Sequence, residues 1–424
     1  MIRTHRRVRT AGIAAALLLT TAGLVTAGPA LASSPPSAAG VADAAGDVRF
    51  ATFNASLNRG VEGALVSDLS TPGNAQADAV AEIIQRANPD VLLINEFDYV
   101  AGGEALRLFQ DNYLSVPHGD AAPVEYAYRY TAPVNTGVPS GFDLNNNGSV
   151  AGGDDAWGFG LFPGQYGMAV YSKLPIDEGA IRTFQNFRWA DMPGALLPDD
   201  PATAAPGDWY SPEELEQFPL SSKSHWDVPI TVSKNKTVHF LVSHPTPPTF
   251  DGAEDRNGTR NHDEIRFWSD YISGGRTAAY ITDDAGRTGG LKGGALFVIA
   301  GDQNADPNDG DSTGGAIHQL LENPRINTSS VPTSLGAPEA TKLQGGVNAS
   351  HLGDPRQDTA DFSEPPGNLR VDYVLPSRQI RILESGVFWP ASDDPLSVLT
   401  GTYPFPSSDH RLVWIDADVP GAKR

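Results

Sequence analysis

Hydrophobic and polar residues alternate in blocks along the chain, and these blocks predict a regular succession of strands and helices. Short apolar runs predict strands at 47–56, 90–96, 166–173, 228–233, 238–244, 295–304, 369–377, 382–389 and 411–419. The run DVLLINE at 90–96 is apolar almost throughout, which is typical of a strand covered on both faces. Apolar residues at helical spacing predict helices at 74–90, 103–114, 261–273 and 314–323.

This order of elements favours an α/β (α+β) fold. Strands outnumber helices, and several neighbouring strands are near enough in sequence to pair as hairpins. Two stacked mixed β-sheets flanked by helices would bury the apolar face of every element. Two long segments, 115–163 and 183–224, are rich in Pro, Gly and Asp and interrupt the pattern. We expect them to be inserts that form the rim of a site within a single domain at 47–419.

The N-terminus has the features of an export signal. Four arginines precede an apolar, alanine-rich stretch at 11–27, and the small-residue site Ala30-Leu31-Ala32 follows it. We expect a signal peptide at 1–32, a flexible Ala/Ser/Pro/Gly-rich leader at 33–46, and a secreted protein. The Arg6-Arg7 pair leaves the choice between the general and twin-arginine export routes open.

Composition narrows the class of protein only a little. The 424 residues carry a net charge of −21 and no cysteine, so an exported domain of this kind depends on packing rather than disulfides. Removal of residues 1–32 would bring the charge to about −25. Such a surface repels nucleic acid and anionic membranes, although a local basic patch or a bound metal can reverse this at one place. Solubility outside the cell explains the acidity equally well.

Polar residues suited to catalysis fall at or beside the ends of the predicted strands, except Asp372, which lies inside one. They are Asn54, Glu96, His244, Asp302, Asn304, Asp372, Asp409 and His410. One acidic residue after a strand is usually a turn former. So many carboxylates and imidazoles beside buried strands are costly, unless a metal ion or shared protons offset their repulsion. The pattern therefore predicts one composite site.

The chemistry that suits this set is hydrolysis of a phosphate ester. Mg²⁺ or Mn²⁺ takes oxygen ligands and needs only one or two protein carboxylates. Glu96 is the first candidate for a metal ligand, with Asn54 and Asp409 in the same shell.

The remaining residues suit the phosphate and the water. Asp302, with Asn304 two residues later, can orient the attacking water, and His244 and His410 can reach the phosphate. A histidine used in this way needs an orienting carboxylate, and Asp372 is the candidate partner of His410.

These motifs resemble the endonuclease/exonuclease/phosphatase superfamily, whose members have a DNase I-like fold. The resemblance rests on FN (53–54), NEFD (95–98), SHP (243–245), GDQNADPND (301–309), VDYVLPS (371–377) and SSDHRLV (407–413), in this order, and covers roughly 47–419. It implies a four-layer sandwich with the active site at one edge of the two sheets.

The same resemblance implies a role for each residue. Glu96 matches the principal metal carboxylate, Asn54 the early asparagine, and Asp302 with Asn304 the central Asp-x-Asn pair. His244 and His410 match the histidine pair, Asp372 the aspartate paired with the last histidine, and Asp409 the aspartate that precedes it.

Two acidic stretches look like calcium loops. In GDQNADPND, Pro307 stands where such a loop requires glycine, so we interpret this stretch as catalytic. In 141–160, by contrast, the spacing of a twelve-residue calcium loop is present at Asp143, Asn145, Asn147, Ser149 and Asp154. Ca²⁺ there would brace the insert rather than take part in hydrolysis; the alternative is an ordinary polar surface loop.

The sequence indicates the substrate-binding residues less clearly than the catalytic ones. Candidates for contact with the substrate are Lys223, His225, Arg260, Asn261 and Tyr166. Arginine suits bidentate contact with a phosphate. Asn261 could equally be the cap of a helix, and Tyr166 could equally pack against neighbouring side chains.

We therefore expect a secreted, divalent-metal-dependent phosphoesterase that acts on small or polyphosphorylated organic esters. The alternatives are an extracellular nonspecific nuclease, a sphingomyelinase-like lipid phosphodiesterase, and a calcium-stabilised binding module without activity. The sequence has no basic tract, which argues against binding to a nucleic-acid duplex. It also has no amphipathic stretch, which argues against binding to a lipid bilayer. Nucleic acid is expected only as a substrate, and we expect a monomer without stable membrane association.

Overall fold

The computed structural model describes residues 47–422 of the chain. The predicted signal peptide at 1–32 and leader at 33–46 lie outside the described residues.

The first sheet has six strands. In spatial order these are β12 (Arg381–Val387), β13 (Val413–Asp418), β1 (Asp47–Leu57), β2 (Val91–Phe97), β4 (Met168–Ser172) and β3 (Tyr128–Tyr130). The β1–β2 pair is parallel and the other pairs are antiparallel. The sheet is therefore mixed, as predicted.

The second sheet has five strands and is also mixed. In spatial order these are β11 (Asp372–Pro376), β8 (Leu296–Asp302), β7 (Lys236–Ser243), β6 (His225–Ser233) and β5 (Arg182–Thr183). Only the β7–β8 pair is parallel. A separate two-stranded ladder joins β9 (Ala360–Asp361) to β10 (Asn368–Leu369).

The two sheets pack face to face through an apolar core, and helices cover their outer faces. Phe50 of β1 meets Phe240 of β7 across the interface, with ring centroids 5.8 Å apart. On the far side of the first sheet lie α1 (Ala64–Leu69), α2 (Ala75–Ala87) and α3 (Glu104–Phe109). On the far side of the second lie α5 (Arg256–Ser273) and α6 (His318–Leu321).

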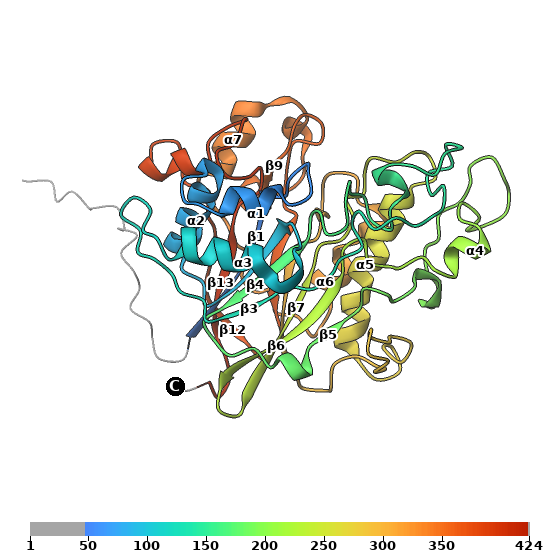
Figure 1. The fold of residues 1–424 in the computed structure, drawn as a ribbon, viewed down its shortest axis with the longest axis horizontal. Coiled ribbons are helices and arrows are strands. Elements are labelled where there is room, and N and C mark those ends of the chain that lie inside the picture. Colours follow the sequence, from blue (N-terminus) through green and yellow to red (C-terminus); the bar gives the residue numbers. More distant parts are fainter. Residues whose placement is uncertain (1–46, 423–424) are drawn as a thin grey trace, which may run out of the picture. The chain divides into compact units, whose positions relative to one another are not determined.

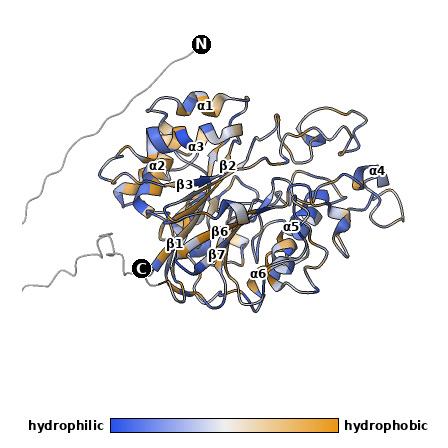
Figure 2. Ribbon diagram, turned by 60° about the horizontal axis from the view of Figure 1, so that its bottom comes forward, coloured by the Kyte–Doolittle hydropathy of each residue, from blue (hydrophilic) through white to orange (hydrophobic). Residues whose placement is uncertain are grey.

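Figure 1 shows these two groups of helices on opposite sides of the strands. Figure 2, coloured by hydropathy, shows the same central strands between them. The predicted four-layer α/β sandwich is confirmed.

Some predicted boundaries are wrong. The helix expected at 261–273 begins five residues earlier, after the N-cap Asp255, so Asn261 lies inside α5 and is not its cap. The helix expected at 314–323 is only α6, because Gly314 and Gly315 adopt positive φ angles ahead of it. The helix expected at 103–114 is α3 followed by a π-helical turn at Gln110–Leu114.

Several short elements were not predicted, among them α1, β3, β5, β9, α4 (Pro212–Leu215) and α7 (Gly336–Gln344). All but α7 are too short to show a period, and the Gly-Ala-Pro start of α7 looks like a loop.

The topology brings the predicted site residues to one edge of both sheets. Parallel strands end on the same side, so Asn54 of β1 and Glu96 of β2 lie together, and Asp302 ends β8 beside the end of β7. Asp372 of β11 pairs directly with Asp302 in the antiparallel register.

The inter-sheet core predicts the effect of removing a large side chain. Phe240→Ala would leave a cavity between the sheets and lower the free energy of unfolding by about 3–5 kcal/mol, measured by chemical denaturation. Leu343→Ala is the matched control because Leu343 is 75% exposed on α7, and it is expected to change stability by less than about 0.5 kcal/mol. Equal effects of the two substitutions would contradict this account of the core.

Candidate active site

Three polar groups from separate segments meet at one oxygen of Asp302. The Asn54 amide nitrogen lies 3.1 Å from Asp302 Oδ2, His244 Nε2 lies 3.4 Å from it, and His410 Nε2 lies 3.7 Å from it. The other oxygen of Asp302 accepts a hydrogen bond from the backbone N–H of Asn304 at 2.8 Å. All four predicted partners are therefore gathered around this carboxylate.

Asn54 connects Asp302 to the outer part of the site. Its amide nitrogen also donates to Glu96 Oε1 at 3.0 Å. Asp409 joins through Ser56, whose hydroxyl donates to Asp409 Oδ1 at 3.2 Å and bonds with the Ser408 hydroxyl. Glu96, Asp409 and Asn304 are partly exposed, whereas Asn54 and Asp302 are buried. The candidate ligands Glu96 and Asp409 are thus more exposed than Asp302.

His410 is held as a cation. Its Nδ1 lies 2.9 Å from Asp372 Oδ2, and the same oxygen accepts a hydrogen bond from the Thr359 hydroxyl at 2.8 Å. Burial lowers the pKa of His410, but the carboxylates of Asp372 and Asp302 outweigh it, so the pKa lies well above its usual range. His410 can therefore donate a hydrogen bond from each ring nitrogen.

His244 differs from His410 in charge. Burial, together with the nearby ammonium of Lys223, lowers the pKa of His244 to about 4. Within the described part of the chain, its Nδ1 atom is buried and has no hydrogen-bond partner. A neutral His244 and a charged His410 therefore face the same carboxylate.

Burial raises the pKa of Asp302, but His410, His244 and Asn54 together hold it well below the usual range. Asp302 is thus anionic at neutral pH, as a group that orients a water molecule must be.

Lys223 and Asn304 converge on another point of the site. Both donate to the backbone carbonyl of Pro245, the residue after His244, at 3.5 Å from Lys223 Nζ and 3.1 Å from the Asn304 amide. Lys223 is buried, and burial lowers the pKa of its ammonium, while the carboxylates of Glu264, Glu96 and Asp302 oppose this effect. The site therefore contains a fixed cation on the side of His244.

Several site residues have a backbone conformation that is unusual for their type. Ser56, Glu96, Tyr166 and Asn304 all have positive φ angles, between 48° and 56°. Such angles are uncommon for residues other than glycine and tend to cluster at functional sites. Glu96 is the second-last residue of β2, and its carboxylate accepts the hydrogen bond from Asn54.

The donor set fits a hard divalent cation. Burial, together with the carboxylates of Asp409 and Asp302, raises the pKa of Glu96 to about 7 against the hydrogen bond from Asn54 and the charge of His410. This is the electrostatic signature of carboxylates that lack sufficient positive charge around them, which a divalent ion supplies. The ligands would be the carboxylates of Glu96 and Asp409 and the side-chain oxygen of Asn54, which accepts the backbone N–H of Ser56 while the nitrogen of the same amide faces Glu96.

A second group of potential ligands lies behind them. Among the described residues, Asp302, Asp372 and His410 bring one atom each to within 4.8 Å of one another. Because His410 Nδ1 is already bonded to Asp372, we interpret this group as a histidine–aspartate pair facing Asp302 rather than as a cation cage.

Three of the predicted substrate contacts are buried, and their polar groups bond to the protein itself. His225 is buried and bonds Ser221 Oγ and the carbonyl of Glu264 through its two ring nitrogens. Arg260 is buried, with its guanidinium on the carbonyls of Leu220, Trp157 and Pro219. Asn261 donates to the carbonyls of Thr246 and Gln303. Arg260 and Asn261 lie on the inward face of α5, and His225 is the first residue of β6, so the polar groups of all three bond to the protein itself.

Tyr166 remains a candidate. It is partly exposed, and burial together with the Glu96 carboxylate raises the pKa of its hydroxyl. Its backbone N–H donates to Asp98 Oδ1 at 3.1 Å, which fixes the loop beside Glu96. A role in substrate contact stays a prediction for Tyr166 and Lys223.

The loop predicted to bind calcium adopts a compact turn. Asp143 accepts hydrogen bonds from the N–H groups of Asn147 and Gly148, and the side chains of Asn145 and Asn147 accept bonds from backbone N–H groups as well. Asp154 is exposed, while its neighbour Asp155 is buried and accepts bonds from Leu144 and Ala151. The expected involvement of Ser149 and of calcium stays a prediction.

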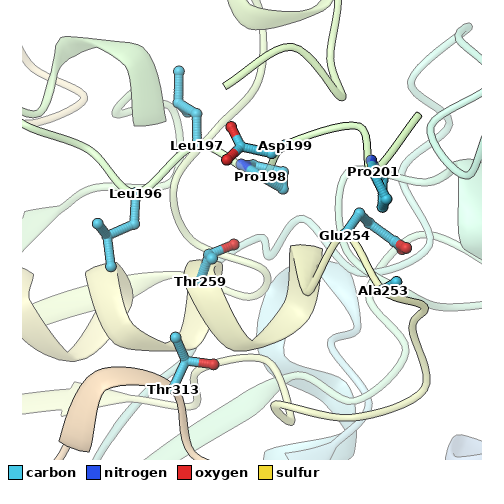
Figure 3. Close-up of a pocket in the computed structure, with 9 residues that line it drawn as sticks. All are labelled: Leu196, Leu197, Pro198, Asp199, Pro201, Ala253, Glu254, Thr259 and Thr313. Atoms are coloured by element: carbon cyan, nitrogen blue, oxygen red, sulfur yellow. The ribbon is translucent and has the colours of Figure 1, made fainter. Parts of the chain in front are cut away.

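A cavity of about 400 Å³ lies elsewhere, between the insert at 196–201 and the start of α5 (Figure 3). It is lined by Leu196, Leu197, Pro198, Asp199, Pro201, Ala253, Glu254, Thr259 and Thr313. None of the predicted site residues lines it.

Sequence reasoning missed the residues that support the site. Thr359 holds Asp372, Asn95 accepts the backbone N–H of Asp302 at 3.1 Å, and Ser408 donates to the carbonyl of Asn54 at 2.7 Å. Asn95 and Ser408 directly adjoin predicted residues, so their position was a usable signal. Thr359 lies in a loop and gave none.

A family model described as "Endonuclease/Exonuclease/phosphatase family" matches residues 51–410. No curated protein sequence matches the chain.

Solved structures with similar folds are distant in sequence. An endonuclease/exonuclease/phosphatase from Beutenbergia cavernae is 17% identical, with a TM-score of 0.47 over 89% of this chain and 72% of that one. Beta toxin from Staphylococcus aureus is 14% identical, with a TM-score of 0.41 over 87% and 99%. Sphingomyelinase C from Streptomyces griseocarneus is 16% identical, with a TM-score of 0.40 over 87% and 99%.

The His410–Asp372 contact predicts a measurable titration. In Asp372→Asn, loss of the carboxylate should lower the pKa of His410 by about one to three pH units, followed by NMR of the imidazole. Because the folded-state pKa is raised, protonated His410 stabilises the fold at low pH, and this contribution is lost as the pH rises through that pKa. An unchanged titration of His410 would show that Asp372 does not hold its charge.

The loop at 143–154 predicts one calcium site. Isothermal titration of Asp143→Ala should show one Ca²⁺ site fewer than the unmodified protein, because Asp143 is the first ligand of the pattern. Equal stoichiometry in the two proteins would remove calcium from this loop.

Proposed function

Because the chain belongs to the endonuclease/exonuclease/phosphatase family, we propose that it is a secreted, divalent-metal-dependent hydrolase of phosphate esters. We further propose that its substrates are small or polyphosphorylated organic esters. Phosphoester hydrolysis is the activity general to this family; the substrate and the location are the further steps.

One observation carries this proposal. The carboxylate of Asp302 receives Asn54 from the first sheet, His244 from the end of β7 and His410 from the segment before β13. Four chain segments that are far apart in sequence would not place a carboxylate, two imidazoles and an amide around one oxygen for packing alone, because each buried polar group is costly without partners.

The metal would be held by Glu96, Asn54 and Asp409. When bound, a divalent ion supplies charge that stabilises the negative oxygens of the transferring phosphoryl group. Mg²⁺ and Mn²⁺ suit this all-oxygen set.

The side chains of the protein position the attacking water and the phosphoryl group. Anionic Asp302 accepts a hydrogen bond from the attacking water and orients it toward phosphorus. His410, kept charged by Asp372, donates from Nε2 to a phosphoryl oxygen.

On the other side, neutral His244 and the amide of Asn304 hold the phosphoryl group in position. The ammonium of Lys223 adds a positive charge beside them. In this arrangement the oxygen of water bonds to phosphorus as the P–O bond to the alcohol breaks. The proton that the water loses passes through the surrounding solvent to the departing oxygen, so a phosphate ester and water give a phosphate product and the free alcohol.

The charge of the molecule supports small substrates. The chain has a net charge of −21, whereas binding along a duplex uses several lysines and arginines at successive phosphates. Lys223 is buried, and the guanidinium of Arg260 is turned to backbone carbonyls. Two buried cations, Lys223 and protonated His410, suit a single reacting phosphate better than a long polyanion. Within residues 47–422, moreover, no helix is both long and apolar enough to cross a bilayer.

A substrate panel tests the proposal. The purified protein is assayed with Mg²⁺, Mn²⁺ or Ca²⁺ against a phosphomonoester, a bis-ester, an inositol polyphosphate, plasmid DNA and sphingomyelin. Release of phosphate or alcohol from the small esters, without plasmid cutting, is expected. Plasmid degradation that depends on Glu96 would establish the nuclease alternative, sphingomyelin cleavage would establish a lipid phosphodiesterase, and inactivity on every substrate would overturn the proposal.

Removal of the metal or of the charged histidine should abolish turnover. EDTA is expected to stop hydrolysis, Glu96→Gln to raise the metal concentration for half-maximal rate, and His410→Asn to lower kcat by about 10²–10⁴-fold. The matched control is His239→Asn, because His239 on β7 also pairs through Nδ1 with a buried aspartate, Asp227, at 2.7 Å. The control should keep full activity; similar losses in both variants would refute the role of His410.

A further inference from the structure

The inward face of α5 carries a polar stripe that contacts three segments of the site. Asn261, Glu264 and Trp268 lie three and four residues apart, so they share one face of the helix. All three are buried. An apolar residue is the usual choice at such positions, so hydrogen bonding must account for the polar ones.

Asn261 joins two active-site loops. Its amide nitrogen donates to the carbonyl of Thr246 at 2.8 Å and to the carbonyl of Gln303 at 2.9 Å. Thr246 follows His244 by two residues, and Gln303 lies between Asp302 and Asn304. A single amide group therefore sets the spacing between the histidine segment and the Asp-x-Asn segment.

Glu264, one turn later, joins the histidine segment to the lysine segment. One carboxylate oxygen accepts the backbone N–H and the hydroxyl of Ser222, at 2.6 Å and 3.1 Å. The other accepts the backbone N–H of Thr246 at 2.7 Å. Ser222 directly precedes Lys223, so this carboxylate spans the backbones beside Lys223 and His244.

Trp268 completes the stripe at the next turn. Its indole N–H donates to the hydroxyl of Ser243 at 2.9 Å, and the same hydroxyl lies 3.3 Å from the Gln303 side chain. Ser243 is the last residue of β7 and precedes His244.

We infer that Asn261 and Glu264 are positioning residues for the reaction, which fix His244, Lys223 and Asp302 relative to one another; this inference rests on the proposed function. Neither side chain touches the substrate. Glu264 acts through the backbone N–H groups of Ser222 and Thr246, and Asn261 through the carbonyls of Thr246 and Gln303. Displacement of a reacting group by about 1 Å can cost about 100-fold in rate, so bonds that fix the backbone on either side of His244 matter for turnover.

The helix itself provides a matched control. Asp263, the neighbour of Glu264, is also a fully buried carboxylate that accepts two short N–H bonds, both at 2.7 Å. One of its oxygens accepts Trp189 and Leu196, in the insert at 183–224, and the other lies 3.1 Å from His262 Nδ1, so it holds none of the strand ends of the site. The change from carboxylate to amide is the same at both positions, but the segments that the two carboxylates hold belong to different parts of the fold.

The test compares Glu264→Gln and Asn261→Ala with Asp263→Asn in the full chain. Glutamine has one acceptor oxygen, so it loses either Ser222 or Thr246. We expect kcat per folded molecule to fall about 10- to 100-fold in the first two variants, with a much smaller change in KM. Asp263→Asn should lower Tm and leave kcat per folded molecule as in the unmodified enzyme.

A second measurement, NMR of the imidazole of His244, needs no substrate. The imidazole NMR resonances of His244 should shift in Glu264→Gln and Asn261→Ala and stay in place in Asp263→Asn. The inference is overturned if the three variants share one kcat, or if the His244 resonances do not respond. If the unmodified protein cleaves no ester of the panel, the proposed function fails, while the resonances still decide whether α5 positions His244.

Discussion

A buried carboxylate is stable only where neighbouring groups donate hydrogen bonds or positive charge to it, and Asp302 is such a group at the end of β8. Asn54, one of its partners, belongs to the other sheet. Asn95 of β2 in addition accepts the backbone N–H of Asp302, again across the interface between the sheets. The site therefore exists only when the two sheets are stacked in one register. Packing of the apolar core and assembly of the site are thus the same structural event.

The two histidines show how environment divides one residue type into two roles. Both face Asp302, but His410 has the Asp372 carboxylate on its far nitrogen, whereas His244 has the Lys223 ammonium nearby. The first is held charged and the second neutral. A phosphoryl group bound between them would meet a cation on one side and a neutral imidazole on the other. An arrangement with two charged histidines would add a second positive charge beside Lys223, at a further cost in burial.

The sequence predicted the elements that have a clear hydrophobic period and the polar residues that stand at the ends of strands. The long strands and the helix at 74–90 have clear periods, and the catalytic candidates stand directly at strand ends, where topology must gather them. The substrate contacts were predicted less well. Arg260 and Asn261 follow the histidine closely in sequence, but a helix turns its residues by about 100° each, so nearness along the chain does not decide which way they point. The role of Thr359 could not be predicted, because only the fold brings it to its partner Asp372.

The backbone at the site gives an independent argument that these residues are kept for function. Ser56, Glu96 and Tyr166 hold left-handed conformations, each at a cost of about 1–2 kcal/mol for a residue with a Cβ atom. Together they cost about 3–6 kcal/mol, which is a large part of the net stability of about 5–15 kcal/mol typical of a folded domain. Glycine would relieve this strain at each position. A glycine at 96, however, would remove the carboxylate, so the strain persists where the side chain is needed and the core of two sheets can sustain it.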